Sequence, residues 1–203
     1  MEIITKNELK ILNLFRKELF LKTSIRDTMK KINSKSYQRV YESVGSLITR
    51  NILSSEKIGN TTLISLNMSR ETFVILAFLD EQEEKKIPNY SNIMEIKEIS
   101  DYLILVTGSY TKGKTTKKSD VDLVIIVPDK ENIVNIQKLV ENMTMLYVPE
   151  IHLHVFRKKD FIEMLKERKE TYGKEIVKNH LILKNAQRYY ELLKEAIENG
   201  YKG

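Results

Sequence analysis

Two short apolar runs, separated by a polar segment, constrain the fold more than any other feature. Residues 102–106 read YLILV, and residues 121–127 read VDLVIIV before Pro128. Runs of this length that are rich in β-branched residues and bounded by Gly or Pro are typical of strands. The segment between them, GSYTKGKTTKKSD, is polar and contains two glycines. The sequence therefore predicts two neighbouring strands joined by a polar turn.

The segment after the first strand matches two phosphate-binding patterns. The P-loop pattern G-x-x-x-x-G-K-[ST] is matched by Gly108, Gly113, Lys114 and Thr115. In a P-loop the phosphates lie on the N-terminus of a helix that follows directly. No helix of ordinary length fits between this pattern and the second strand. The P-loop interpretation therefore fails on its structural context.

The second pattern is a Gly-Ser turn followed by Asp-x-Asp. Gly108 lets the backbone approach a phosphate oxygen, and Ser109 adds a hydroxyl donor. Residues two apart on a strand share a face, so Asp120 and Asp122 direct two carboxylates toward one place. Carboxylates are hard oxygen ligands for Mg²⁺, which neutralises a triphosphate. Four lysines placed to counter phosphate charge lie between them: Lys112, Lys114, Lys117 and Lys118.

Gly108-Ser109 followed by DVDL at residues 120–123, with apolar runs on both sides, resembles the polymerase beta-type nucleotidyltransferases. Within that superfamily it is most similar to the minimal nucleotidyltransferases of prokaryotes. The resemblance implies transfer of a nucleoside monophosphate from an NTP to a hydroxyl acceptor. It implies that Asp120 and Asp122 hold Mg²⁺ or Mn²⁺. It also implies a nucleotide site made of Gly108, Ser109, Lys112, Lys114 and Lys118.

The family normally has a third acidic residue on the following strand, which completes the metal site and can act as a base. Residues 149–156 alternate here, with Glu150, His152 and His154 on one face. Glu150 is the one acid on that face, so we assign the third catalytic and metal-binding role to it. The two histidines stay open as alternatives, either as metal ligands or as structural residues. With a histidine in the third position, the two-metal site would be incomplete.

The net charge of +6 is unevenly distributed along the chain. Residues 1–67 contain 12 Lys and Arg but 6 Asp and Glu, whereas residues 68–203 contain 22 of each. Such asymmetry predicts two functional units, of which the first binds an anionic partner. The alternative is a lysine-rich surface that serves solubility.

Capping signals and helical periodicity predict three helices and a hairpin in residues 1–67. Thr5-x-x-Glu8 is a capping box that opens a helix extending to about Lys22. Ser24 is placed to cap a short second helix, and residues 36–50 carry the apolar stripe of a third. Residues 52–66 alternate around Gly59-Asn60, as in a hairpin.

This order of elements resembles the winged helix-turn-helix family. The resemblance implies that the third helix enters the major groove of duplex DNA and that the hairpin touches the backbone. Side chains expected at base edges are Ser36, Gln38, Arg39 and Ser43. Those expected near phosphates are Lys35, Arg50 and Lys57. The alternative is a module that serves dimerisation or domain packing.

An α/β protein in three parts is therefore expected: a winged helix (1–67), a connector helix (68–87) and a nucleotidyltransferase domain on a small mixed sheet (88–203). The connector is apolar on much of its circumference and could form the seam of a homodimer. With no Cys, no membrane span and no apolar leader, we expect a cytoplasmic enzyme without thiolate chemistry. The rival hypothesis is a DNA-binding, antitoxin-like regulator with a catalytically weak domain. The acceptor stays open: an RNA end, a protein hydroxyl or a small molecule.

Overall fold

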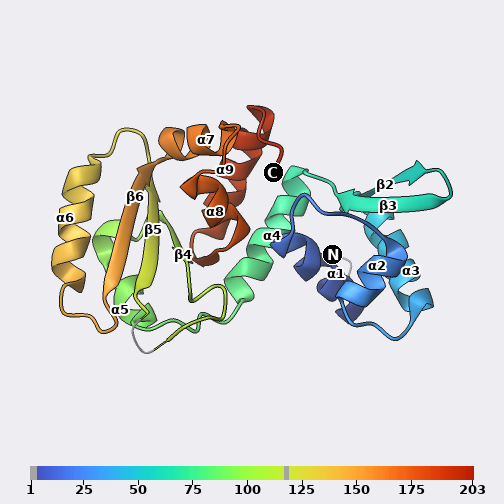
Figure 1. The fold of residues 1–203 in the computed structure, drawn as a ribbon, viewed down its shortest axis with the longest axis horizontal. Helices are drawn as coiled ribbons and strands as arrows, with labels where there is room; N and C mark the ends of the chain where they lie inside the picture. Colours follow the sequence, from blue (N-terminus) through green and yellow to red (C-terminus); the bar gives the residue numbers. More distant parts are fainter. Residues whose placement is uncertain (1–3, 117–118) are drawn as a thin grey trace. The chain divides into compact units, whose positions relative to one another are not determined.

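The computed structural model describes residues 4–116 and 119–203. The chain divides into two compact units, residues 1–76 with 202–203 and residues 77–201 (Figure 1). Both combine helices with a small sheet, which confirms the mixed α/β class. No helix in the described ranges is long and apolar enough to cross a membrane.

In residues 4–69 the first unit has three helices and a three-stranded antiparallel sheet of order β1-β3-β2. Its elements are α1 (Lys6–Lys17), β1 (Lys22–Ser24), α2 (Ile25–Lys31), α3 (Tyr37–Thr49), β2 (Leu53–Ile58) and β3 (Thr61–Leu66). The first helix ends at Lys17 and not near Lys22, because residues 22–24 pair with β3. Strand β1 was not expected, since its three residues are too few to form a recognisable alternating pattern.

The predicted caps of the first unit are present. Thr5 and Glu8 form both hydrogen bonds of the capping box, and Ser24 caps α2. Ser36, which was expected at a base edge, caps α3. Glu8 is 2% exposed, and its carboxylate accepts a 2.6 Å hydrogen bond from Ser46 of α3. The guanidinium of Arg50 lies 3.5 Å from the same carboxylate. One buried acid therefore joins the start of α1 to the C-terminal half of α3.

The boundary between the units falls inside α4 (Arg70–Gln82), within the segment predicted to connect them. This helix ends at Gln82 and does not continue to Pro88. Residues 80–86 read DEQEEKK, which gives a further turn no apolar side chain to bury. Short helices in water depend on such burial for their stability.

The second unit is built on a mixed four-stranded sheet of order β6-β5-β4-β7. Its elements are α5 (Tyr90–Met94), the 3₁₀ turn η1 (Lys97–Ile99), β4 (Leu103–Thr107), β5 (Val121–Val127), α6 (Ile133–Thr144), β6 (Ile151–Arg157), α7 (Lys158–Lys166), α8 (Tyr172–Lys178), β7 (Leu181–Lys184) and α9 (Ala186–Glu198). Strand β5 is parallel to β6 and antiparallel to β4, and α6 makes the crossover. Both predicted strands and the mixed sheet are confirmed.

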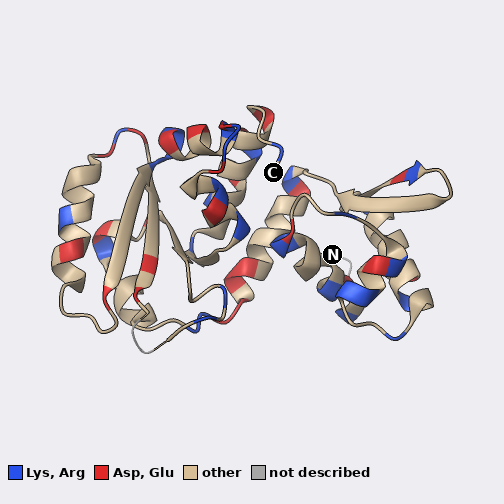
Figure 2. Cartoon of the chain, in the orientation of Figure 1, with Lys and Arg blue, Asp and Glu red and all other residues tan. Residues whose placement is uncertain are grey.

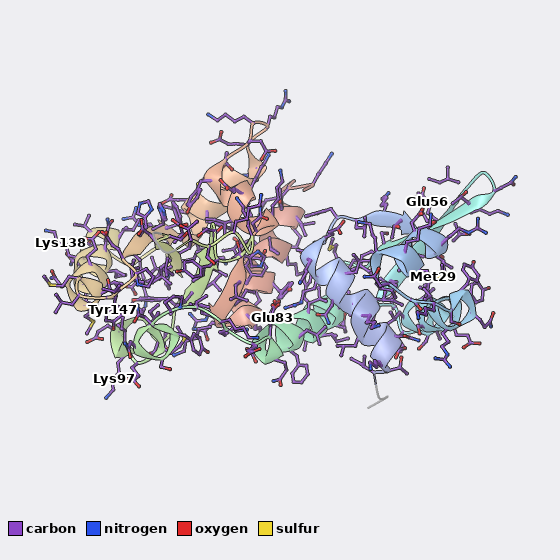
Figure 3. All side chains as sticks on the ribbon, turned by 60° about the horizontal axis from the view of Figure 1, so that its bottom comes forward. Met29, Glu56, Glu83, Lys97, Lys138 and Tyr147 are labelled. Carbon is purple, nitrogen blue, oxygen red and sulfur yellow. The ribbon has the colours of Figure 1, made fainter. Side chains whose placement is uncertain are left out.

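The two faces of this sheet have different roles. One packs on α5 and α6 through a buried apolar cluster that includes Ile93, Val106, Leu123, Val140 and Leu153. Tyr147, which is labelled in Figure 3, lies between those two helices. It lines an open hollow of about 330 Å³. The opposite face lies toward α7, α8 and α9 (Figure 1). The alternation of β5 and β6 brings the polar residues of both strands to this second face.

Candidate active site

A tight turn begins where β4 ends. Gly108 has φ +75°, and its carbonyl accepts from the N–H of Lys112 at 3.3 Å. The carbonyl of Ser109 accepts from the N–H of Lys114 at 3.1 Å. In the described parts of the loop no helix separates this turn from β5. The P-loop alternative therefore lacks the helix that it requires.

Gly108 is in close contact with the carboxylate of Asp122. A Cβ atom added to Gly108 would lie 1.9 Å from Oδ2 of Asp122, which is far inside any van der Waals contact. The closeness follows from the antiparallel pairing of Thr107 with Asp122. The sequence indicated a glycine here for phosphate approach, and the structure adds the need to leave room for Oδ2.

The other oxygen of Asp122 faces β6. Nδ1 of His152 lies 3.3 Å from Oδ1, because parallel pairing sets His152 beside Asp122. His154 follows on the same face, and ligand atoms of all three side chains lie within 4.8 Å of one another. A histidine and not an acid therefore lies beside Asp122 on the third strand.

The remaining candidate carboxylates lie outside this group of three. Asp120 is exposed and directly precedes β5. Glu150 is exposed and directly precedes β6, where its carbonyl accepts from the N–H of Val121 at 2.9 Å. The predicted role of Glu150 stays a prediction, but the structure does not bring its side chain into the group around Asp122.

Hydrogen bonds and an ion pair connect α8 and its C-cap residue, Asn179, to the end of β4 and to the glycine turn. The hydroxyl of Thr107 donates to the carbonyl of Asn179 at 2.6 Å, and Thr111 makes a longer bond to the same carbonyl. Nζ of Lys112 lies 3.0 Å from the carboxylate of Glu175 on α8. One lysine expected at the phosphates is therefore paired with an acid. Lys114 is exposed, Ser109 is half-buried, and Lys118 lies outside the described residues.

Aromatic rings fix the position of His154. Its ring centroid lies 4.8 Å from that of Tyr172 on α8 and 6.3 Å from that of Phe156, with the Phe156 ring parallel to it. Burial lowers the pKa of His154, and the charge of His152 lowers it further, against the opposing effect of Asp122. Burial and His152 thus favour the neutral ring, the form in which histidine binds metals.

Tyr172 was not among the predicted site residues. Burial raises its pKa to about 12, with Asp122 and Glu175 contributing, so its hydroxyl stays protonated. Nothing in the sequence around Tyr172 distinguishes it from a core tyrosine. Its place beside His154 arises only from the packing of α8.

The predicted nucleic-acid residues of the first unit divide into exposed and internal ones. Lys35, Gln38, Arg39 and Lys57 are exposed, and Lys and Arg occur on the helices and the hairpin of this unit (Figure 2). Ser36 serves as the N-cap of α3. Ser43 is buried and donates to the carbonyl of Arg39 at 2.8 Å, so its expected place at a base edge is wrong. Arg50 pairs with the buried Glu8.

Residues 89–184 match the model of a protein family described as a nucleotidyltransferase domain. The matched range contains β4, the glycine turn, β5, β6 and α8. The match supports the nucleotidyltransferase superfamily for this part of the chain. Searches of curated proteins and of solved structures found no match.

Proposed function

Starting from a nucleotidyltransferase domain at residues 89–184, we propose that this protein transfers a nucleoside monophosphate from an NTP to a hydroxyl acceptor. The observation that carries the proposal is the glycine turn, which lies directly against Asp122 within the matched range. A glycine turn beside a carboxylate suits an NTP that arrives with a divalent cation.

In this reaction the acceptor oxygen attacks the α-phosphorus of the NTP. A new P–O bond forms, the bond from the α-phosphorus to the oxygen shared with the β-phosphate breaks, and pyrophosphate leaves with the electron pair. The acceptor hydroxyl gives up its proton to solvent. The hydroxyl of Ser109 and the backbone of the turn would donate to phosphate oxygens, which holds the chain of phosphates in place. Lys112 would exchange its contact with Glu175 for one with phosphate. Mg²⁺ or Mn²⁺, when bound, supplies charge neutralisation.

The described residues fit that cation only in part. Asp120 and Asp122 offer carboxylate oxygens, the donors that Mg²⁺ prefers. The neighbour of Asp122 on β6 is His152, and imidazole is a poor ligand for Mg²⁺. We therefore place His152, and not Glu150, in the third position. An oxygen-only site for two Mg²⁺ ions is not completed there.

Transfer can be tested with the full-length chain and each of the four NTPs labelled at the α-phosphate, with Mg²⁺ or Mn²⁺. Cell RNA and cell protein are supplied as separate acceptors, and label in the product is classified by nuclease or protease digestion. Asp122→Asn should abolish labelling. Asp160→Asn, on the surface of α7, should not. A wild-type chain that labels no acceptor with any NTP would contradict the proposal.

A second candidate function is supported by the first unit. It combines a charge excess with an α3 helix that exposes Gln38 and Arg39. We propose that residues 1–67 form a winged helix that binds duplex DNA or RNA. If labelling fails while DNA binding is found, a DNA-binding regulator with a catalytically weak domain becomes the better description. His152 beside Asp122 favours that alternative.

A further inference from the structure

We propose that Asp122, His152 and His154 form a binding site for one divalent transition-metal ion, of the Zn²⁺, Co²⁺ or Mn²⁺ type. This site is separate from the Mg²⁺ that accompanies the NTP. Binding of the ion stands on the geometry of the three side chains alone. Its use in the transfer of a nucleoside monophosphate rests on the proposed function.

The spacing of the donor atoms suits a common ion. Two ligand atoms on one such ion are separated by roughly 3.0–3.4 Å, given metal–ligand bonds of about 2.1 Å. Oδ1 of Asp122 and Nδ1 of His152 are already 3.3 Å apart. Atoms of the whole group lie within 4.8 Å, so rotation of the side chains can bring the third ligand into range.

The donor set is what distinguishes this site from a magnesium site. Two imidazole nitrogens and one carboxylate oxygen suit transition metals, whereas Mg²⁺ requires oxygen ligands and retains water. Three protein ligands also leave coordination positions open, as in catalytic and not structural sites. The side chain of His152 is 64% exposed, so those open positions can face solvent or substrate.

The site is partly organised before any ion binds. His154 is held among the rings of His152, Phe156 and Tyr172, which limits its rotation. Strand pairing fixes His152 opposite Asp122. A ligand that is already oriented loses less conformational entropy when it binds an ion.

Asp122 can serve both sides of the site at once. Oδ1 faces the histidines, while Oδ2 lies against Gly108 at the start of the glycine turn. One oxygen is therefore available for an ion on the histidine side. The other remains on the side where the NTP and its Mg²⁺ are expected.

The proposal is tested by direct metal binding to the chelator-treated, full-length chain. Co²⁺, Zn²⁺, Mn²⁺ and Mg²⁺ are offered separately without nucleotide, and retained metal is measured after gel filtration. The absorption spectrum reports the ligands of bound Co²⁺. We expect one equivalent of Co²⁺, Zn²⁺ or Mn²⁺ per chain, each offered separately, and no retained Mg²⁺. A chain that retains no transition metal, or retains Mg²⁺ equally well, overturns the proposal.

Variants separate a metal ligand from a hydrogen-bonding histidine. His152→Asn keeps an N–H donor for Asp122 but removes the imidazole, so a purely structural role predicts unchanged metal retention. We expect His152→Asn, His154→Asn and Asp122→Asn each to weaken binding more than about tenfold, since even outer-shell partners contribute that much. Retention by both histidine variants overturns the assignment.

Two control variants replace side chains that could bind a metal but lie outside the proposed site. The sequence has three histidines and no cysteine, so His180→Asn tests the one remaining imidazole. Glu150→Gln tests the acid first predicted for the third position. Both should retain the ion, and loss of binding in Glu150→Gln alone would return the site to that residue. If a variant fails to fold, Zn²⁺ titration of the wild type by NMR should shift the rings of His152 and His154 and not that of His180.

The outcomes for the ion and for the transfer reaction are distinguishable. Tight binding of Co²⁺ or Zn²⁺ without labelling by any NTP retains the metal site and removes the proposed function. Labelling with Mg²⁺ alone, by a chain that binds no transition metal, supports the proposed function and removes the metal site.

Discussion

Gly108 is subject to two constraints at one position: a positive φ, and an oxygen of Asp122 beside the place that a Cβ atom would take. Gly113 in the same loop has φ +62°, but no atom of the described residues lies within 4 Å of the place that a Cβ atom would take there. Alanine at Gly108 must therefore displace the side chain of Asp122, whereas alanine at Gly113 meets backbone strain alone. We expect Gly108→Ala to abolish binding of Mg-NTP and Gly113→Ala to weaken it less than about fivefold, as strain of about 1 kcal/mol allows.

Calorimetric titration of Mg-NTP into the two variants checks this comparison, with circular dichroism as the test of folding. Thr115→Ala should bind like the wild type, and Ser109→Ala should lose about 1–2 kcal/mol, the contribution of one hydrogen bond to a charged oxygen. Equal loss in Gly113→Ala and Thr115→Ala would restore the P-loop interpretation.

The ionisation of His154 gives a second prediction about a single residue. In the metal-free chain its ring should titrate below the ordinary pKa of 6.5, because burial and His152 both oppose its charge. Asp122→Asn should lower that pKa further, and His152→Asn should raise it. The unfolded chain binds this proton more readily than the folded one, so the free energy of unfolding should decrease as the pH falls below about 6.5.

Ring resonances followed by NMR against pH provide the measurement. The direction of change in the two variants is the decisive point. An increase of the His154 pKa in Asp122→Asn would show that the carboxylate does not act on this ring.

For individual site residues, the local sequence pattern predicts the strand face on which they lie but not their neighbours on other strands. Alternation along residues 149–156 correctly set His152 and His154 on one face. It could not determine which residue lies beside Asp122, because that depends on the register between β5 and β6, and α6 lies between these strands in sequence. The charge of Glu150 favoured that residue, and Tyr172 carried no local signal at all.

Helices were most predictable where a side chain caps the N-terminus of its own helix. Thr5 and Ser24 cap the helices that they were predicted to begin. Local signals did not reveal β1, whose strand character comes from pairing with β3, or the early end of α4. Both depend on what the rest of the chain offers for pairing or burial.

The carboxylate of Glu8 makes a buried polar contact between α1 and α3. Burial alone would raise the pKa of Glu8, but hydrogen bonds from Ser46 and Thr5 and the charge of Arg50 outweigh it and lower the pKa. Glu8→Ala leaves Arg50 without this partner and should destabilise the first unit by about 2–4 kcal/mol. The exposed Glu42 on α3 is the matched control, and its alanine variant should change stability by less than about 0.5 kcal/mol.

Because the chain has two units, one melting temperature does not isolate the first. Hydrogen exchange of the α1 amides measures its opening free energy directly. The same experiment at falling pH should show stability lost below about 4.5, since the folded pKa of Glu8 lies under that value. Unchanged protection of α1 in Glu8→Ala would mean that apolar packing alone holds the two helices.

At the scale of the whole molecule, the charge difference between residues 1–67 and the rest predicts salt-sensitive binding of duplex DNA. Arg39→Ala should cost about 1–3 kcal/mol at a specific site, if its side chain reads a base. Lys57→Ala should weaken binding to all sequences alike and reduce the salt slope by about one. Lys138→Ala, on α6 of the second unit (Figure 3), should have no effect.

Fluorescence anisotropy of the full-length chain with random and selected duplexes, across a range of salt concentrations, measures these quantities. An affinity that does not change with salt would remove the nucleic-acid interface. Equal weakening by Lys138→Ala would reduce it to general charge attraction.

If the proposed ion and the NTP both bind at the carboxylate of Asp122, their two binding events are energetically reciprocal. Whatever factor an ion at the histidines contributes to the affinity for NTP, bound NTP must contribute to the affinity for that ion. A cell that depletes or supplies the metal would then adjust nucleotide occupancy through a single side chain. The contact that excludes a methyl group at Gly108 would thus give this small domain a means of sensing metal supply.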